Sequence, residues 1–120
     1  MENIIEWHGN DGTNYFFQSE FPYDVTAQYG EGGYNAFRVD ESVTSFQGYG
    51  MGMYSFFRDH TVTVENAIQA PKNVAGVQFT NVCTVFLSGN GGISHVIDDM
   101  GAAVNSGFRD TPSAVCKLHA

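Results

Sequence analysis

The feature that most limits the fold of this chain is a series of short runs rich in aromatic and β-branched residues, each closed by glycine, proline or asparagine. Such runs are typical of strands joined by tight turns, and they recur roughly every 8–12 residues. No run alternates with a long helical pattern, so the sequence does not predict a parallel α/β fold. We therefore predict a single all-β domain over residues 1–120, either a compact β-sandwich or a short β-solenoid-like domain of about eight to ten short strands.

Composition agrees with this prediction and narrows the classes of partner. The 120 residues include ten Phe, six Tyr and fourteen Gly, which suits strands and turns. The net charge of −8 argues against binding to nucleic acid or to anionic membranes, and it is compatible with neutral glycans. No apolar stretch approaches the roughly 20 residues of a membrane span. We expect a glycan or polysaccharide partner, no nucleic acid and no membrane insertion.

Turn signals divide the chain into elements. Pro22 is expected to end the strand before it, and the segment AQYGEGGYN is expected to be a glycine-rich loop. Residues 65–69 have the pattern of a single helical turn, whereas residues 89–92, GNGG, predict a tight turn. In residues 48–53, glycine alternates with Tyr or Met, so one face of a strand there would be bare backbone. We interpret that face as a packing surface, with a ligand shelf as the alternative.

The run YSFFRDH ends in three adjacent polar residues, Arg58, Asp59 and His60. Neighbouring side chains of a strand point to opposite faces, so the three cannot converge on one substrate. A contact that fixes a strand end is the favoured interpretation, and a ligand contact is the alternative.

Aromatic and acidic residues supply further candidates for a sugar site. Trp7, His8 and Asp11 could combine an indole face with a carboxylate that accepts hydrogen bonds from hydroxyl groups, although Trp7 could equally belong to the core. The tyrosines of the glycine-rich segments, Tyr29, Tyr34 and Tyr49, are also candidate ligand-binding residues.

The sequence predicts no metal site and no cofactor. No two histidines have the spacing of a helical metal site, and no cluster of thiols or carboxylates completes a ligand set. Cys83 and Cys116 match neither a zinc nor a redox spacing, and the sequence leaves open whether they pair. The N-terminal MENIIEWHG lacks the regions of a signal peptide, so we expect a protein that is cytoplasmic, leaves by another route or has had its signal removed.

Roughly residues 7 to 107 resemble the C-terminal portion of large secreted microbial proteins of glycoside hydrolase family 55 and the pectate-lyase-like β-helix superfamily, described as exo-β-1,3-glucanase-like. The resemblance is strongest in the segments FFQSEFPYDV, YSFFRDH and TVFLSGNGGISHVIDD. It implies that the hydrolytic carboxylates belong to a larger β-helical body, so no catalytic residue of the family matches a position here. A piece that once packed on a solenoid would also expose apolar surface, which predicts a homo-oligomer.

These observations favour a small, non-catalytic, lectin-like protein of fungal type that recognises neutral glycans such as β-glucan. Two alternatives remain. One is a defence or immunomodulatory protein that acts through protein contacts. The other is a trimmed glycoside hydrolase-like enzyme, for which Glu20, Asp59, Asp98 and Asp99 are the candidate carboxylates.

Overall fold

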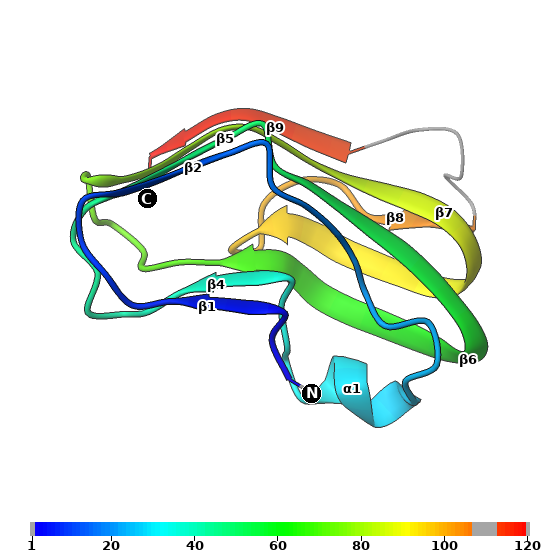
Figure 1. Ribbon diagram of the computed structural model, residues 1–120. Helices are drawn as coiled ribbons and strands as arrows, with labels where there is room; N and C mark the ends of the chain where they lie inside the picture. The colour runs from blue at the N-terminus through cyan, green and yellow to red at the C-terminus, as the bar shows by residue number, and fades with distance from the viewer. Residues whose placement is uncertain (1, 107–112, 120) are drawn as a thin grey trace.

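The chain folds into about three turns of a parallel β-solenoid, which confirms the prediction of an all-β domain. The computed structural model describes residues 2–106 and the backbone of residues 113–119 (Figure 1). The described elements are β1 (Ile5–Trp7), β2 (Gly12–Tyr15), β3 (Gln18–Glu20), α1 (Ala27–Glu31), β4 (Phe37–Val39), β5 (Phe46–Tyr49), β6 (Gly52–Gln69), β7 (Val77–Ile97), β8 (Val104–Asn105) and β9 (Ser113–His119). None of the described helices is long and apolar enough to cross a membrane.

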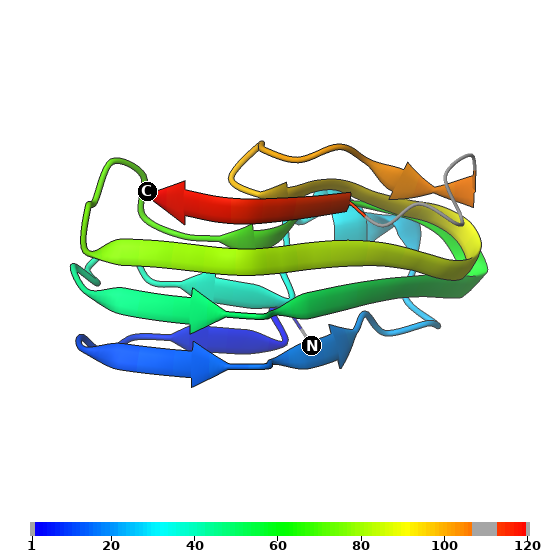
Figure 2. The ribbon, with the colours of Figure 1, turned by 90° about the horizontal axis from the view of Figure 1, so that it is seen from above.

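Successive turns of the chain stack in parallel register. On one side of the solenoid, Ile5 lies beside Phe37, Phe37 beside Ile68, and Ile68 beside Ile97. A second side is formed by β2, β5 and the start of β7, and a third by β3, β6 and the middle of β7. The layers are visible from above in Figure 2, where β2, β5, β7 and β9 follow one another. The β-sandwich alternative is therefore wrong, because a sandwich needs two antiparallel sheets packed face to face.

The core lies inside the solenoid and is built from stacked aromatic rings. The Phe46 ring lies 5.6 Å from the Phe37 ring and 5.6 Å from the Phe79 ring, measured between centroids. All three side chains are buried. Alternation positions them, since the outward residues Arg38 and Gln47 separate inward neighbours on β4 and β5. The aromatic content of the sequence is thus used mainly to fill the interior.

Glycines allow β7, the longest strand, to bend at a corner of the solenoid. β6 has 18 residues and β7 has 21, far longer than the short strands predicted. The GNGG segment is a bend inside β7, where Gly89 and Gly91 both have positive φ. A Cβ on Gly91 would lie 1.9 Å from the carbonyl oxygen of Val62, so close stacking of the rungs requires glycine there.

Other local predictions have mixed outcomes. β3 ends at Glu20, before Pro22, as expected. Residues 65–69 belong to β6, so the predicted helical turn is wrong, because a parallel ladder with β7 satisfies their backbone groups instead. The AQYGEGGYN segment is not simply a loop, since α1 forms within it and buries Tyr29.

The glycine-alternating segment forms a corner instead of one strand. Gly50 has a φ of 65° and separates β5 from β6, so the predicted continuous bare face is absent. The close contacts of Gly48 nevertheless agree with the packing interpretation, because an added Cβ there would lie 2.9 Å from the Phe79 ring. Met51 and Met53 fill the interior beside it.

Antiparallel strands flank β7 near the end of the chain. β8 pairs with β7 at Gly92 and Ile93, and β9 pairs with residues 78–84. In this register Cys83 lies opposite Ala114, and Cys83 is a free cysteine whose pKa is raised by burial. The side chain of Cys116 lies outside the described residues.

Candidate functional site

The structure distributes the predicted ligand-binding residues over four separate parts of the solenoid and does not bring them into one site. These parts are the corner after β1 with Trp7, His8 and Asp11, the α1 region with Tyr29 and Tyr34, the outer face of β5 with Tyr49, and a projection of β6 with Arg58, Asp59 and His60. Each part has its own chemistry.

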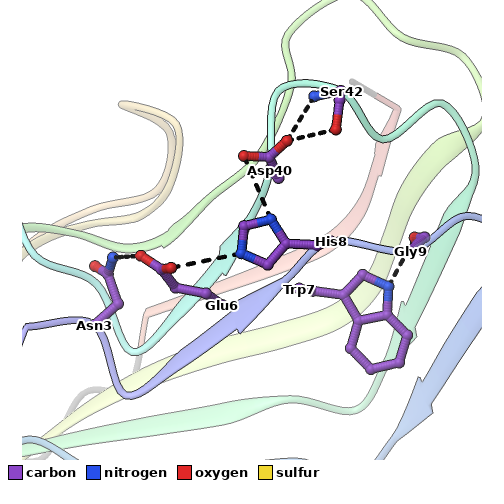
Figure 3. Close-up of polar contacts among 7 residues, drawn as sticks. All are labelled: Asn3, Glu6, Trp7, His8, Gly9, Asp40 and Ser42. Atoms are coloured by element: carbon purple, nitrogen blue, oxygen red, sulfur yellow. Dashed lines mark hydrogen bonds and ion pairs between the residues drawn. The ribbon is translucent and has the colours of Figure 1, made fainter.

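The corner after β1 contains a histidine held between two carboxylates (Figure 3). His8 Nε2 lies 3.5 Å from Glu6 Oε2, and His8 Nδ1 lies 3.6 Å from Asp40 Oδ1. Arg38 stands beside Glu6 on the neighbouring strand and completes the lining of a shallow surface pocket. We call Glu6, His8, Arg38 and Asp40 the His8 corner. It offers both acceptors and donors to a polar ligand.

Hydrogen bonds lower the pKa of both carboxylates of the His8 corner. The Asn3 amide donates to Glu6 Oε1 at 2.6 Å, and this bond is the main cause of the lowered pKa of Glu6, with His8 adding to it. The Ser42 hydroxyl and backbone N–H both donate to Asp40 Oδ2 and lower the pKa of Asp40. Only an imidazolium could donate to both carboxylates at once, since a neutral ring has one N–H.

Trp7 packs against the core next to this corner. Its ring lies 5.3 Å from the Phe46 ring and stacks on Phe37 at 6.4 Å between centroids. Its indole N–H donates to the carbonyl oxygen of Gly9 at 2.9 Å. The indole is therefore half-buried and already hydrogen-bonded, so the geometry agrees with a core role better than with a sugar shelf.

Asp11 fastens the first turn of the solenoid to the second. Its carboxylate accepts a hydrogen bond from the Ser45 hydroxyl at 2.6 Å, and its backbone N–H donates to the Ser45 carbonyl at 3.0 Å. Asp11 has a φ of 61°, a conformation that aspartate tolerates better than most residues. A shallow pocket opens beside it over the start of β2 and β5, with Thr13 and Gln47 in its lining.

Two tyrosines continue this outer face at the far ends of β2 and β5. Tyr15 lies directly opposite Tyr49, with ring centroids 5.3 Å apart and planes 13° from parallel. Tyr15 is 65% exposed, and the adjoining Phe16 is 77% exposed. We call Tyr15 and Tyr49 the tyrosine pair. Beside the pair, a row of polar residues crosses β2, β5 and β7 and consists of Thr13, Gln47 and Gln78. We call these three residues the polar row.

Tyr15 and Phe16 were not among the predicted residues, because only strand register places Tyr15 next to Tyr49. The available signal was the alternation in GTNY, which puts Thr13 and Tyr15 on one face of β2. It could not reveal that this face points to solvent.

The contacts of Tyr29 and Tyr34 indicate that both residues stabilise the fold. Tyr29 is 6% exposed, and its hydroxyl donates to the backbone carbonyl of Glu2 at 2.9 Å. Burial, together with the nearby Tyr34, raises the pKa of Tyr29 to about 12. The two rings lie 5.3 Å apart, so this pair anchors α1 and the start of the chain to the solenoid.

Arg58, Asp59 and His60 project from β6. Phe57 pairs with Gly89 and Val62 pairs with Gly91, so residues 58–61 have more chain than the partner strand and bulge outward. Arg58 Nε donates to Asp59 Oδ1 at 2.8 Å, and its guanidinium lies 4.4 Å from the centroid of the Tyr23 ring. These contacts agree with the interpretation that the triplet stabilises a strand irregularity.

The candidate hydrolytic carboxylates are also dispersed. Glu20 is exposed at the end of β3, beside Tyr54 on β6. Asp98 is half-buried and accepts a hydrogen bond from the Ala70 N–H at 3.1 Å, and burial raises its pKa. Asp99 is exposed, and hydrogen bonds from Asn66 lower its pKa.

Comparison with known proteins gives a consistent relationship. No family model matches the chain. An exo-beta-1,3-glucanase of Streptomyces sp. (strain SirexAA-E / ActE) is 38% identical over 117 residues, which cover 92% of this chain and 19% of that protein. The structure of sacteLam55A from Streptomyces sp. SirexAA-E superposes with a TM-score of 0.82 at 34% identity, and a variant of it in complex with glucose superposes with 0.86 at 33% identity. Each match covers 94% of this chain and 21% of the solved one.

The chain therefore spans about a fifth of the length of the relatives that it matches. The resemblance to a segment of the exo-β-1,3-glucanase-like β-helix proteins is confirmed in both sequence and fold. These relatives are bacterial, so they do not support the expectation of a fungal type.

Proposed function

We propose that this chain binds neutral β-glucans, without cleaving them, through the outer face of β2, β5 and β7. The observation that carries the proposal is the exposed tyrosine pair beside a polar row, on a segment similar to part of an exo-β-1,3-glucanase. Aromatic faces stack on the C–H groups of a pyranose, while amide and hydroxyl groups bind its hydroxyls.

The shape of this face suits a polysaccharide. Neighbouring strands lie about 4.8 Å apart, so side chains at matching positions of β2, β5 and β7 form straight rows. One row is aromatic at Tyr15 and Tyr49 and continues to Thr80, and the row beside it contains Thr13, Gln47 and Gln78. An uncharged ligand is not repelled by the net charge of −8.

The His8 corner supports the same proposal from the adjoining end of the face. Residues 8–11 connect β1 to β2, so Asp11 lies between the His8 corner and the polar row. The carboxylates of Glu6 and Asp40 accept hydrogen bonds, and Arg38 donates them. The corner therefore offers polar groups at the turn that leads into β2.

A fragment with hydrolytic activity is the second candidate function, and the similarity to an exo-beta-1,3-glucanase favours it. Burial raises the pKa of Asp98, and a hydrogen bond from Asn66 lowers the pKa of Asp99. Against this role, Asp98 already accepts a backbone hydrogen bond. Release of glucose from laminarin, measured over hours, tests the activity, and loss of release in Glu20→Gln or Asp98→Asn would identify the carboxylate.

The test of glycan binding is a calorimetric titration with laminarin, a soluble β-1,3-glucan, with the mass of the protein in solution measured alongside. Cellulose oligosaccharides and starch serve as controls for linkage. We expect saturable binding to laminarin and weaker binding to the controls. Absence of binding at millimolar sugar in a folded protein would contradict the proposal. Attachment to cells that persists after deglycosylation would instead favour a defence or immunomodulatory role.

A further inference from the structure

We propose that Glu65, His95 and Asp99 form a surface site for a divalent transition-metal ion of the Zn²⁺ type. One ligand atom of each residue lies within 4.8 Å of the other two. Glu65 belongs to β6, His95 to β7, and Asp99 to the turn that follows β7. We call these three residues the His95 cluster. It lies apart from the face that we propose for glucan, and nothing in the sequence spacing indicated it.

A backbone hydrogen bond determines which nitrogen of His95 is free. His95 Nδ1 lies 3.1 Å from the carbonyl oxygen of Gly101. A carbonyl oxygen only accepts, so Nδ1 carries the hydrogen and the neutral ring presents its lone pair at Nε2. Histidines that bind metals are commonly oriented in this way, with the second ring nitrogen donating to a carbonyl or carboxylate.

The free nitrogen faces another acceptor. His95 Nε2 lies 3.8 Å from Glu65 Oε1, so in the neutral ring a nitrogen lone pair lies near a carboxylate oxygen. Only a cation between them or a second proton on the ring turns this contact into an attraction. The chain carries a net charge of −8, which attracts cations to its surface and favours protonation of the ring as well.

Asp99 is held in place by the neighbouring turn of the solenoid. Its backbone N–H donates to Asn66 Oδ1 at 2.8 Å, and Asn66 Nδ2 donates to Asp99 Oδ1 at 3.3 Å. The turn itself is closed by the Met100 N–H, which donates to the Ile97 carbonyl at 2.8 Å. The Asp99 carboxylate is therefore positioned before any ion arrives.

One cation already approaches this carboxylate. Lys72 Nζ lies 3.5 Å from Asp99 Oδ2, on a side chain that is 64% exposed. An exposed pair of this kind contributes little free energy, so an ion can displace the ammonium. Asp98 adds a half-buried carboxyl behind the cluster, but its Oδ1 is occupied by the Ala70 N–H.

The ligand set selects the class of metal. An imidazole nitrogen with two carboxylates suits Zn²⁺ or Co²⁺, whereas Ca²⁺ and Mg²⁺ prefer oxygen ligands alone. Zinc binds such ligands at about 2.0–2.2 Å, so rotation of the exposed Glu65 side chain has to bring its carboxylate somewhat closer. Water would complete the coordination.

The experiment titrates the chelator-treated full chain with Zn²⁺ by calorimetry and with Co²⁺ by visible absorption. We expect one equivalent to bind, with affinity at least about tenfold weaker in Glu65→Gln and in His95→Gln. Lys72→Ala should tighten binding severalfold, because the competing ammonium is removed. The matched control is His8→Gln, which alters a histidine with two carboxylates at similar distances and should leave the affinity unchanged.

Nitrogen chemical shifts of the imidazole rings provide a second measurement that does not depend on variant stability. In the wild-type chain, added Zn²⁺ should shift Nε2 of His95 and leave His8 unchanged. Binding that is unaffected by both Glu65→Gln and His95→Gln would overturn the proposal. So would a shift at another histidine, or the absence of any shift at His95.

Discussion

Tyr15 and Tyr49 lie opposite each other on adjacent turns of the solenoid, and their rings are stacked with centroids 5.3 Å apart. They lie level with each other because the parallel register pairs the last residue of β2 with the last residue of β5. The pair is therefore a fixed aromatic platform whose position depends on the register of the sheet.

We expect Tyr49→Ala to weaken laminarin binding about tenfold, which corresponds to about 1.4 kcal/mol. The variant removes one ring and leaves Tyr15 without its stacking partner. Leu87→Ala is the control, since Leu87 is 49% exposed on β7 and is not part of the tyrosine pair or the polar row. Calorimetric titration measures both. Equal affinity in Tyr49→Ala and the wild type would remove the tyrosine pair from the binding face.

Gly48→Ala should reduce the free energy of unfolding by about 1–3 kcal/mol, because an added methyl group overpacks the core. The new Cβ would lie 2.6 Å from Met51 Sδ and 2.9 Å from the Phe79 ring. Urea unfolding followed by circular dichroism measures the change. In Gly9→Ala the nearest atom is 4.0 Å away, so this control should lose much less stability.

Asp98→Asn should make the folded chain more stable at neutral pH. Burial raises the pKa of Asp98 in the folded chain, so between the ordinary aspartate pKa of about 3.9 and this raised pKa the folded state binds more protons than the unfolded state. The free energy of unfolding therefore falls as the pH rises through that window. Asp98→Asn does not lose this free energy. The difference in free energy of unfolding between the variant and the wild type should therefore disappear at pH values below the ordinary aspartate pKa.

Urea unfolding of Asp98→Asn at several pH values between 3 and 7 checks the sign. Asp99→Asn is the contrasting variant, because hydrogen bonds lower the pKa of Asp99 and its charge stabilises the folded state above the ordinary pKa. A constant difference between Asp98→Asn and the wild type at every pH would contradict the expectation.

Asp59→Asn should change the free energy of unfolding little and leave laminarin binding unaltered. The Arg58–Asp59 ion pair is exposed, and exposed pairs contribute little. Thermal unfolding and the laminarin titration measure the two quantities. A large loss of affinity would restore the ligand-contact alternative for YSFFRDH.

The prediction of strands succeeded where local chemistry decides the backbone. Pro22 ends a strand because it cannot donate to a ladder, and the glycines of GNGG mark a real bend. Prediction failed at residues 65–69, where a helical pattern was overridden by pairing with β7, since long-range hydrogen bonds outweigh a weak local preference.

The candidate sites were harder to predict than the strands. Trp7 and His8 are adjacent in the sequence, yet Trp7 packs on the core and His8 faces two carboxylates at the surface. Tyr15 was not predicted because Tyr49, its partner in the strand register, lies 34 positions away in the sequence. Strand alternation separates neighbours, and stacking of turns brings distant residues together.

Composition, alternation and local motifs were enough to predict the all-β class, the acidic surface and the similarity to a glucanase segment. The choice of a solenoid, and the contacts of Tyr15 with Tyr49 and of Glu65 with His95, became known from the folded chain. Parallel stacking fixes such contacts by the register between turns. That register depends on how the whole interior packs, which no short stretch of sequence specifies.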